Sequence, residues 1–347
     1  MAANKAITIG DTVVAPGQRA NINLPVGDLY TATSLSMPMQ VICGRTSGPT
    51  LFVSAAIHGD ELNGVEIIRR LLKRKALSSI RGTLLAAPIV NVHGFLNQSR
   101  YLPDRRDLNR SFPGTSKGSI AARLARTFFS EIVSQADYGI DLHTGAINRT
   151  NLPQIRGNLD DANTLDLANA FGVPVIINAN IRDGSLRACA AERGMPVLIY
   201  EAGEALRFDE ISIRAGLRGI TNIMRSIGML PKLRKPAKPG NPVLARSTSW
   251  VRAPVSGIVS DKVKLGSTVA KGQCLAIIGD PLGTQEEIAR APLDGIVIGM
   301  SRLPLAHEGD ALFHIAEFKS ISRAEVLVEE FTATHDPNPQ TTGEVID

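Results

Sequence analysis

Residues 50 to about 228 alternate between short apolar runs and longer amphipathic stretches. The apolar runs are TLFVSAAI (50–57), GTLLAAPIVN (82–91), YGIDLH (138–143), VPVIINAN (173–180) and PVLIYEAG (196–203). Amphipathic segments such as ELNGVEIIRRLLKR (61–74) and SIAARLARTFFSEIV (119–133) lie between them. This alternation predicts an α/β domain with a mostly parallel mixed sheet flanked by helices. Such sheets carry their ligands at the carboxyl ends of the strands, so we expect the functional residues there.

The last helix of this domain is predicted over DEISIRAGLRGITNIMRSIG, at 209–228. Ile213, Leu217, Ile220 and Met224 recur at helical spacing, and Gly228 is suited to end the helix. With an N-terminal β segment at 1–49, we therefore expect the catalytic domain to span 1–230.

A change of composition marks the end of this domain. Residues 231–243, PKLRKPAKPGNPV, are rich in proline and lysine, which predicts an extended linker. Beyond it APVSGIV (253–259) recurs as APLDGIV (291–297), which indicates a small all-β barrel or sandwich at 244–328. This part resembles the biotinyl and lipoyl carrier fold, but its hairpin reads GDPLG (279–283) and has no lysine to modify. We expect an accessory domain, followed by a frayed polar tail at 329–347.

Composition limits the functions open to the chain. The formal charge is +5, but aromatic residues are only 4% and the basic residues are dispersed, which argues against nucleic acid and favours a small anionic substrate. No stretch has the length of a signal peptide or membrane span. The three cysteines lie far apart without a C-x-x-C pair, as in reduced proteins. We expect a cytoplasmic protein without membrane contact, and a homo-oligomer remains open.

Three residues at predicted strand ends have the chemistry of a catalytic zinc site. His58 and Glu61 form an H-x-x-E pair directly after the first apolar run, and His143 ends a second strand-like run. Catalytic zinc is commonly held by three protein ligands of these types, with one position left open. An isolated H-x-x-E pair is often a surface feature, but the buried strand before it favours a metal site. The ligand types predict one Zn²⁺ per chain, although other divalent ions are compatible with them.

The segment NVHGFLNQSRYLPDRRDLNRSFPG, at 91–114, predicts a long functional loop between a strand and a helix. It carries Arg100, Arg105, Arg106, Asn109 and Arg110. A guanidinium group can bind a carboxylate through two parallel hydrogen bonds. Some of these arginines are expected to pair with the aspartates of the loop. Asn109 and Arg110 are the candidates for substrate binding, and Arg156 is a candidate for closing the pocket.

Glu201 is the candidate general base. It follows the apolar residues VLIY (197–200), which places its carboxylate at the end of a buried strand in a dry pocket. There it can accept a proton from water and pass it to a leaving amine. Glu204 is the competing residue, but it follows Gly203, where we expect the chain to have left the strand. A solvated loop position is therefore expected for Glu204.

The motifs HGDE, DLNRSFPG, DLHTG and YEAG together resemble the succinylglutamate desuccinylase and aspartoacylase family, relatives of the zinc carboxypeptidases, over residues 50–228. The resemblance implies a zinc-carboxypeptidase-like fold and gives His58, Glu61 and His143 as zinc ligands. It also implies that Glu201 is the catalytic acid and base, and that Asn109 and Arg110 hold a substrate carboxylate. Arg100, followed by Tyr101, would stabilise the oxyanion. Arg105 and Arg106 are alternatives for that role, because the segment after Tyr101 is longer than in the family.

These features predict a zinc-dependent hydrolase that deacylates a small N-acylated amino acid or related carboxylate. One alternative is a zinc carboxypeptidase acting on short peptides, which would use the same ligands and the same Asn-Arg pair. The other is a homologue that keeps the fold only for binding.

Overall fold

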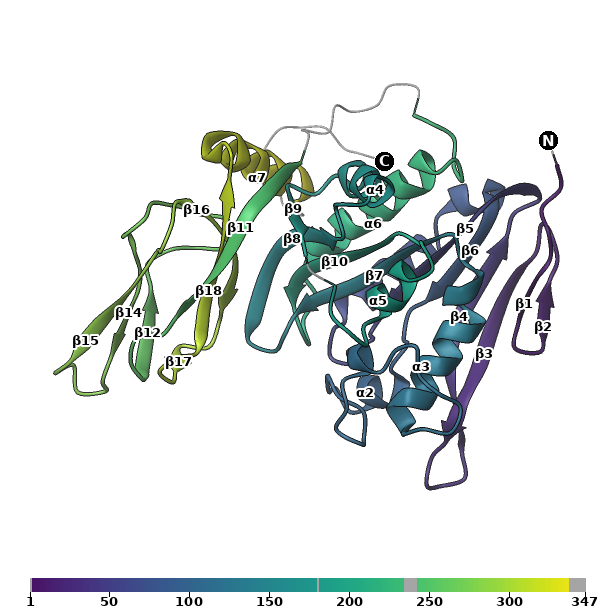
Figure 1. The fold of residues 1–347 in the computed structure, drawn as a ribbon, viewed down its shortest axis with the longest axis horizontal. Coiled ribbons are helices and arrows are strands. Elements are labelled where there is room, and N and C mark those ends of the chain that lie inside the picture. The colour runs from purple at the N-terminus through teal and green to yellow at the C-terminus, as the bar shows by residue number, and fades with distance from the viewer. Residues whose placement is uncertain (1, 180, 234–241, 337–347) are drawn as a thin grey trace.

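The structure is a computed structural model that describes residues 2–179, 181–233 and 242–336. Its centre is a 12-stranded mixed sheet in the order β13-β16-β18-β11-β9-β8-β10-β7-β5-β6-β4-β3 (Figure 1). Four neighbouring strands in the middle run parallel: β10 (Val197–Glu204), β7 (Tyr138–Gly145), β5 (Thr46–Ala55) and β6 (Arg81–Ala87). The predicted α/β class with a mixed sheet is therefore confirmed.

Antiparallel strands extend this parallel centre on both sides. β4 (Ser34–Cys43) and β3 (Arg19–Asp28) form one edge, and β1 (Ile7–Ile9) pairs with β2 (Thr12–Val14) in a separate hairpin. On the other side β8 (Arg149–Gly157) runs antiparallel to β10 and parallel to β9 (Val175–Asn178). β8, which the sequence analysis did not predict, is thus an internal strand of the sheet.

Helices cover both faces of the sheet. α1 (Asn63–Leu71), α4 (Ala162–Phe171) and α6 (Glu210–Ser226) contribute to one apolar core, whereas α3 (Ile120–Glu131) and α5 (Leu186–Ala191) contribute to the other. Short helical segments complete the domain: α2 (Val92–Leu96), η1 (Lys75–Ser79), η2 (Leu108–Arg110) and η3 (Val133–Gln135). The predicted apolar face of α6 is confirmed, since Ile213, Leu217, Ile220 and Met224 are all buried.

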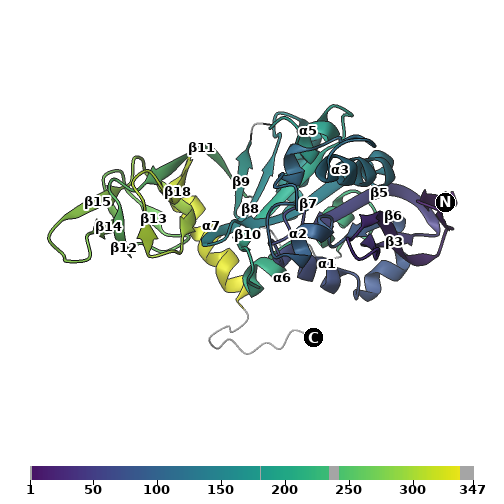
Figure 2. The ribbon, with the colours of Figure 1, turned by 90° about the horizontal axis from the view of Figure 1, so that it is seen from below.

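The C-terminal strands form two sheets that share one apolar core. β11 (Val243–Arg252), β13 (Thr268–Val269), β16 (Gly295–Ser301) and β18 (Ala311–Phe318) belong to the large sheet. β12 (Gly257–Asp261), β14 (Cys274–Gly279), β15 (Glu286–Arg290) and β17 (Leu305–Ala306) form a four-stranded sheet. Figure 2 shows this strand-rich part as a lobe beside the α/β part.

The two lobes are joined by backbone pairing as well as by the chain. β11 pairs in parallel with β9, and β16 pairs with β8, so the main sheet continues from one lobe into the other. Most of the predicted linker falls on 234–241, outside the described residues. Its boundaries, and the carrier-like barrel or sandwich, stay predictions.

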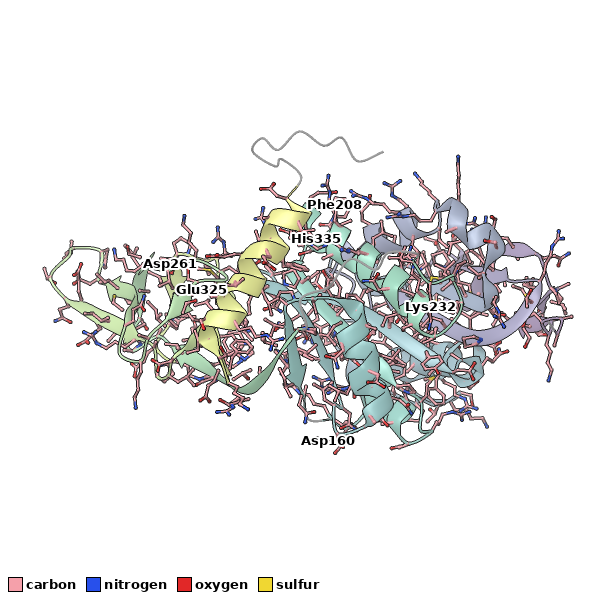
Figure 3. The ribbon with its side chains drawn as sticks, turned by 90° about the horizontal axis from the view of Figure 1, so that it is seen from above. Asp160, Phe208, Lys232, Asp261, Glu325 and His335 are labelled. Atoms are coloured by element: carbon pink, nitrogen blue, oxygen red, sulfur yellow. The ribbon has the colours of Figure 1, made fainter. Side chains whose placement is uncertain are left out.

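Helix α7 (Ile321–His335) corrects the predicted frayed tail, because residues 329–335 are helical. Ala324 and Val328 pack in a core with strands of both lobes, and Phe331 joins the core of the α/β lobe. Figure 3 shows α7, labelled at Glu325 and His335, lying across the junction of the lobes. These apolar contacts explain why the segment is ordered despite its polar composition. Across the described ranges, none of the helices has the length and apolarity needed to cross a membrane.

Candidate metal centre and catalytic pocket

Three neighbouring parallel strands bring the predicted site residues to one edge of the sheet. His58 follows the end of β5, His143 lies in β7, and Glu201 lies in β10 directly beside His143 in the parallel register. This is where ligands of parallel sheets bind, because the connections after the strands diverge there. The register explains how residues far apart in the sequence become neighbours.

His58, Glu61 and His143 form a compact buried cluster. One potential ligand atom from each residue lies within 4.8 Å of the others. His58 Nδ1 is 2.7 Å from Glu61 Oε1, and His143 Nδ1 is 2.8 Å from Glu61 Oε2. The backbone N–H of Thr144 donates to Glu61 Oε2 at 3.1 Å and fixes the carboxylate. The three side chains predicted as ligands are thus together and face one point.

Two aspartates that the sequence analysis did not place beside the histidines contact the second nitrogen of each imidazole. His143 Nε2 is 2.7 Å from Asp141 Oδ2, and Ser54 Oγ donates to the other oxygen of Asp141 at 2.7 Å. His58 Nε2 is 3.1 Å from Asp107 Oδ1. Metal-binding histidines usually have their second nitrogen on a carboxylate in this way, which fixes the ring and its tautomer. The sequence could have indicated Asp141, because it lies two residues before His143 and alternate residues of a strand share a face.

The charges in this cluster stabilise one another. Burial by itself raises the pKa of Glu61, but the combined effect of His58 and His143 is larger and in the opposite direction. The pKa of Glu61 therefore lies well below the ordinary value. Burial lowers the pKa of His143, yet Asp141 and Glu61 outweigh it and hold the pKa well above the ordinary value. Each carboxylate therefore favours the charged form of the imidazole beside it.

The donor set fits a divalent transition metal ion. Two imidazole nitrogens and one carboxylate oxygen converge from buried side chains, and both rings are oriented by carboxylates. Three protein ligands of this kind are typical of catalytic sites, whereas structural zinc sites usually have four.

Gly59 lets the segment that carries His58 and Glu61 approach helix α2 closely. We predict that Gly59→Ala disturbs both this segment and α2. A β-carbon at this position would lie 1.9 Å from the carbonyl carbon of Gly94 and 2.1 Å from the amide nitrogen of Phe95. Since these neighbours are backbone atoms, relief requires moving His58 or α2. Overpacking of this kind costs about 1–3 kcal/mol. Denaturant unfolding and metal analysis should show lower stability and lower metal content; unchanged values for both would contradict the close approach.

The arginine loop brings Arg100 to the cluster and leaves the two alternatives outside. Arg100 Nη2 donates to Asp107 at 2.9 Å, and its Nη1 lies 3.5 Å from Glu61 Oε1. Arg106 is mostly exposed and approaches Asp104 at 3.8 Å, and Arg105 is also exposed. The cavity lining includes Arg100 but neither Arg105 nor Arg106. Geometry therefore favours Arg100 among the three candidates.

Asn109 and Arg110 lie at the same cavity, in η2. Asn109 is buried, and its Oδ1 accepts a hydrogen bond from the backbone N–H of Leu186 at 3.0 Å, which ties the loop to the start of α5. Arg110 donates to the backbone oxygen of Asn109. The guanidinium of Arg110 thus lies at the surface of the cavity that also contains the His58-Glu61-His143 cluster.

Glu201 lies at the cavity with two partners from β8. Asn151 Nδ2 donates to Glu201 Oε2 at 3.3 Å, and Arg156 Nε is 3.2 Å from the same oxygen. Arg156, predicted to close the pocket, thus lines it and forms an ion pair with Glu201. Glu204 lies outside the lining and pairs with Arg207 at 3.4 Å. The expected solvated loop position of Glu204 is wrong, because β10 extends to this residue and its side chain is mostly buried. Of the two glutamates, Glu201 is the one that lines the cavity.

The cavity has a volume of about 710 Å³ and is lined by both lobes. The C-terminal lobe contributes Thr248, Trp250, Arg252 and Ala311, and the sequence analysis assigned none of them to the site. It also missed the lining residues Arg149, Asn151 and Arg187. These positions carry no local motif. The pairing of β8 with β10 and of β9 with β11 brings those on β8 and β11 to the cavity, whereas Arg187 is placed there by α5.

Comparison with known proteins agrees with this architecture. Residues 47–227, just over half of the chain, match the succinylglutamate desuccinylase/aspartoacylase catalytic domain. The chain belongs to this family, which confirms the predicted resemblance.

Particular relatives extend the similarity beyond the catalytic domain. An N-alpha-acetyl-L-2,4-diaminobutyric acid deacetylase of Halomonas elongata is 29% identical over 315 residues, covering 86% of this chain and 91% of the relative. The structure of a succinylglutamate desuccinylase/aspartoacylase from Rhodobacter sphaeroides has a TM-score of 0.77 at 27% identity, covering 86% of this chain and 96% of the other. The ectoine utilization protein EutE of Ruegeria pomeroyi shares the fold, with a TM-score of 0.79 at 23% identity over 91% of this chain and 99% of its own.

Proposed function

We propose that the protein is a zinc-dependent hydrolase that removes the acyl group from a small N-acylated amino acid. The observation that carries this proposal is the buried His58-Glu61-His143 cluster, which shares one cavity with Glu201. Membership of the desuccinylase/aspartoacylase family supports it, as does the similarity to a deacetylase of an acylated amino acid. A cytoplasmic location is part of the same proposal.

His58, Glu61 and His143 would hold the zinc ion. When bound, the ion would supply Lewis-acid activation of the acyl carbonyl and of water. Asp107 and Asp141 would keep both imidazoles oriented, because each accepts a hydrogen bond from the ring nitrogen that faces away from Glu61.

Substrate binding would use the arginine loop. Asn109 and Arg110 would hold the carboxylate of the amino acid, placing the acyl group toward the cluster. Arg100 would stabilise negative charge that develops on the carbonyl oxygen in the tetrahedral transition state. Its bond to Asp107 fixes the guanidinium before substrate arrives, so little reorganisation is required.

Glu201 would move the protons. As a general base it accepts a proton from the attacking water, and it then donates this proton to the nitrogen of the leaving amino acid. The Asn151 amide and the Arg156 guanidinium contact the same oxygen of this carboxylate and keep it directed into the cavity.

The proposal is tested by metal analysis together with a panel of substrates. Purified protein should contain about one zinc per chain and release free amine from an N-acetyl, N-succinyl or N-formyl amino acid. Short peptides serve as the comparison, because a carboxypeptidase would use the same clamp. Zinc with peptide cleavage alone would indicate a carboxypeptidase, and protein that cannot be loaded with metal would indicate a homologue that only binds.

A further inference from the structure

Strand β15 lies at the open edge of the four-stranded sheet in the C-terminal lobe. The strand order is β15-β14-β12-β17, so within the described part of the chain one side of the β15 backbone has no strand to pair with. Figure 1 shows β15 at the end of this lobe that points away from the α/β lobe. An unpaired edge of this kind can pair with a strand of another chain unless the protein blocks it.

Strand β3, at one end of the large sheet, has such a block, whereas β15 does not. β3 contains Pro25, and its register shifts between Pro25 and Gly27. Proline lacks the backbone N–H that pairing requires, and both features are typical of edges that are protected from association. The sequence of β15, EEIAR at 286–290, has neither proline nor glycine. Its backbone is therefore able to accept a further strand.

The outer face of the small sheet carries a row of apolar side chains that ends at this edge. Ile258 of β12 lies directly opposite Leu305 of β17. Ile277 of β14 lies opposite Ser260 of β12 on one side and Ile288 of β15 on the other. All five side chains lie on one face, because cross-strand partners and alternate residues of a strand share a face. Ile258, Ile288 and Leu305 are 48%, 39% and 57% exposed, so this face is available for contact.

The charges of β15 are complementary to those of a second β15 that runs antiparallel to it about Ile288. This pairing places Glu286 of each strand opposite Arg290 of the other, and Ile288 opposite its own copy. A parallel pair in register would instead place like charges side by side, which destabilises a sheet. Within the described residues neither Glu286 nor Arg290 forms an ion pair, and Arg290 donates to the backbone oxygen of Gly272 at 3.1 Å. Both charges are therefore available to a partner strand.

We propose that two copies of this chain associate by antiparallel pairing of their β15 strands about a two-fold axis at Ile288. The pairing joins the two four-stranded sheets into one continuous sheet and extends the apolar row from one copy into the other. A two-fold contact uses the open β15 edge of both copies, so the assembly closes at the dimer. β17, at the other end of the sheet, is only Leu305–Ala306 and is too short to continue it.

The proposed interface is separate from the catalytic cavity. The described residues of the C-terminal lobe that line the cavity lie on β11 and β18, and none of them lies on β15. The inference therefore does not rest on the proposed reaction, and loss of the dimer would leave that proposal unaffected. Because positions 286, 288 and 290 are exposed, variants there should keep the circular dichroism spectrum of the wild type, which checks that they fold.

Sedimentation velocity of the full chain over a concentration series measures the association. We expect the wild type to form a dimer. Glu286→Arg and Arg290→Glu should each raise its dissociation constant by about tenfold to a hundredfold, because each change replaces two attractive contacts with repulsive ones. Arg246→Glu is the matched control, a charge reversal at an exposed position of β11, and should leave the dissociation constant unchanged.

A mixture of the two single variants tests the pairing itself. In a mixed dimer the arginine introduced at 286 faces the glutamate introduced at 290, while the native Arg290 of one chain faces the native Glu286 of the other. The mixture should therefore associate about as tightly as the wild type. A mixture that stays as dissociated as each variant alone would overturn the interface. So would a monomeric wild type, or a dimer that neither variant weakens.

A cysteine cross-link tests the register without changing the complementary charges. Ile288→Cys should give a disulfide-linked dimer on mild oxidation, because position 288 faces its own copy and opposite residues of an antiparallel pair lie within disulfide distance. Glu287→Cys is the control and should not cross-link, since it lies opposite Ala289 of the other copy. The wild type under the same oxidation gives the background from the native cysteines. Cross-linking of Glu287→Cys but not of Ile288→Cys would overturn the proposed pairing.

Discussion

Glu201→Gln should lower turnover by about 100-fold to 10,000-fold while leaving the metal content unchanged. This is the range that general acid-base catalysis contributes. Glutamine keeps the shape of the side chain and can still contact Asn151, but it cannot accept the proton of water. Because Glu201 is absent from the His58-Glu61-His143 cluster, the metal should remain. Steady-state rates on the best acylated amino acid, with zinc measured on the same preparation, provide the test.

Glu204→Gln is the matched control for this prediction. The residue lies on the same strand but outside the cavity lining, paired with Arg207. We expect close to wild-type rates from it. If Glu201→Gln kept more than a tenth of the wild-type rate, or if Glu204→Gln were the inactive variant, the assignment of the proton-transfer residue would be wrong.

The second large effect is expected from His143→Ala, which should weaken zinc binding by more than about 100-fold. Loss of residues that merely orient a metal ligand costs about 10-fold to 100-fold in affinity, so loss of a ligand should cost more. The variant also leaves Asp141 and Glu61 without their shared cationic partner in a buried cluster. Competition with a chelator measures the affinity, and turnover should fall with it.

His93→Ala is the control, since His93 is a half-buried histidine outside the cluster. It should keep zinc and activity.

The pH dependence gives a further check on the same site, because the pKa of His58 and of His143 is raised in the metal-free protein. Zinc must displace these protons, so its affinity should rise as the pH increases through the raised pKa values. A chelator titration that gave wild-type affinity for His143→Ala would refute the ligand set.

The α/β lobe was largely predictable because its signals are local. Each strand of the parallel centre is a short apolar run, and the buried positions of α6 follow a helical period that can be read within the segment itself. The sequence analysis did not predict β8, and it predicted a frayed tail where the second half of α7 lies. β8 begins with the polar residues Arg149, Thr150 and Asn151, a composition that is typical of a loop. In the structure Arg149 and Asn151 line the cavity, which accounts for their polarity. α7 is stabilised by packing across both lobes, which has no local signal.

The residues of the site likewise fall into those that the sequence indicates and those that only the fold brings together. The sequence by itself determined the candidate residues, because His58, Glu61, His143 and Glu201 have side chains suited to metal binding and proton transfer at the ends of recognisable strands. Only the tertiary structure chose Arg100 over its neighbours and added Asp107 and Asp141 behind the histidines. It also placed Trp250 and Arg252 in the cavity. These are contacts between segments far apart in the chain, set by strand register and lobe packing, whereas side-chain chemistry is a property of each residue alone.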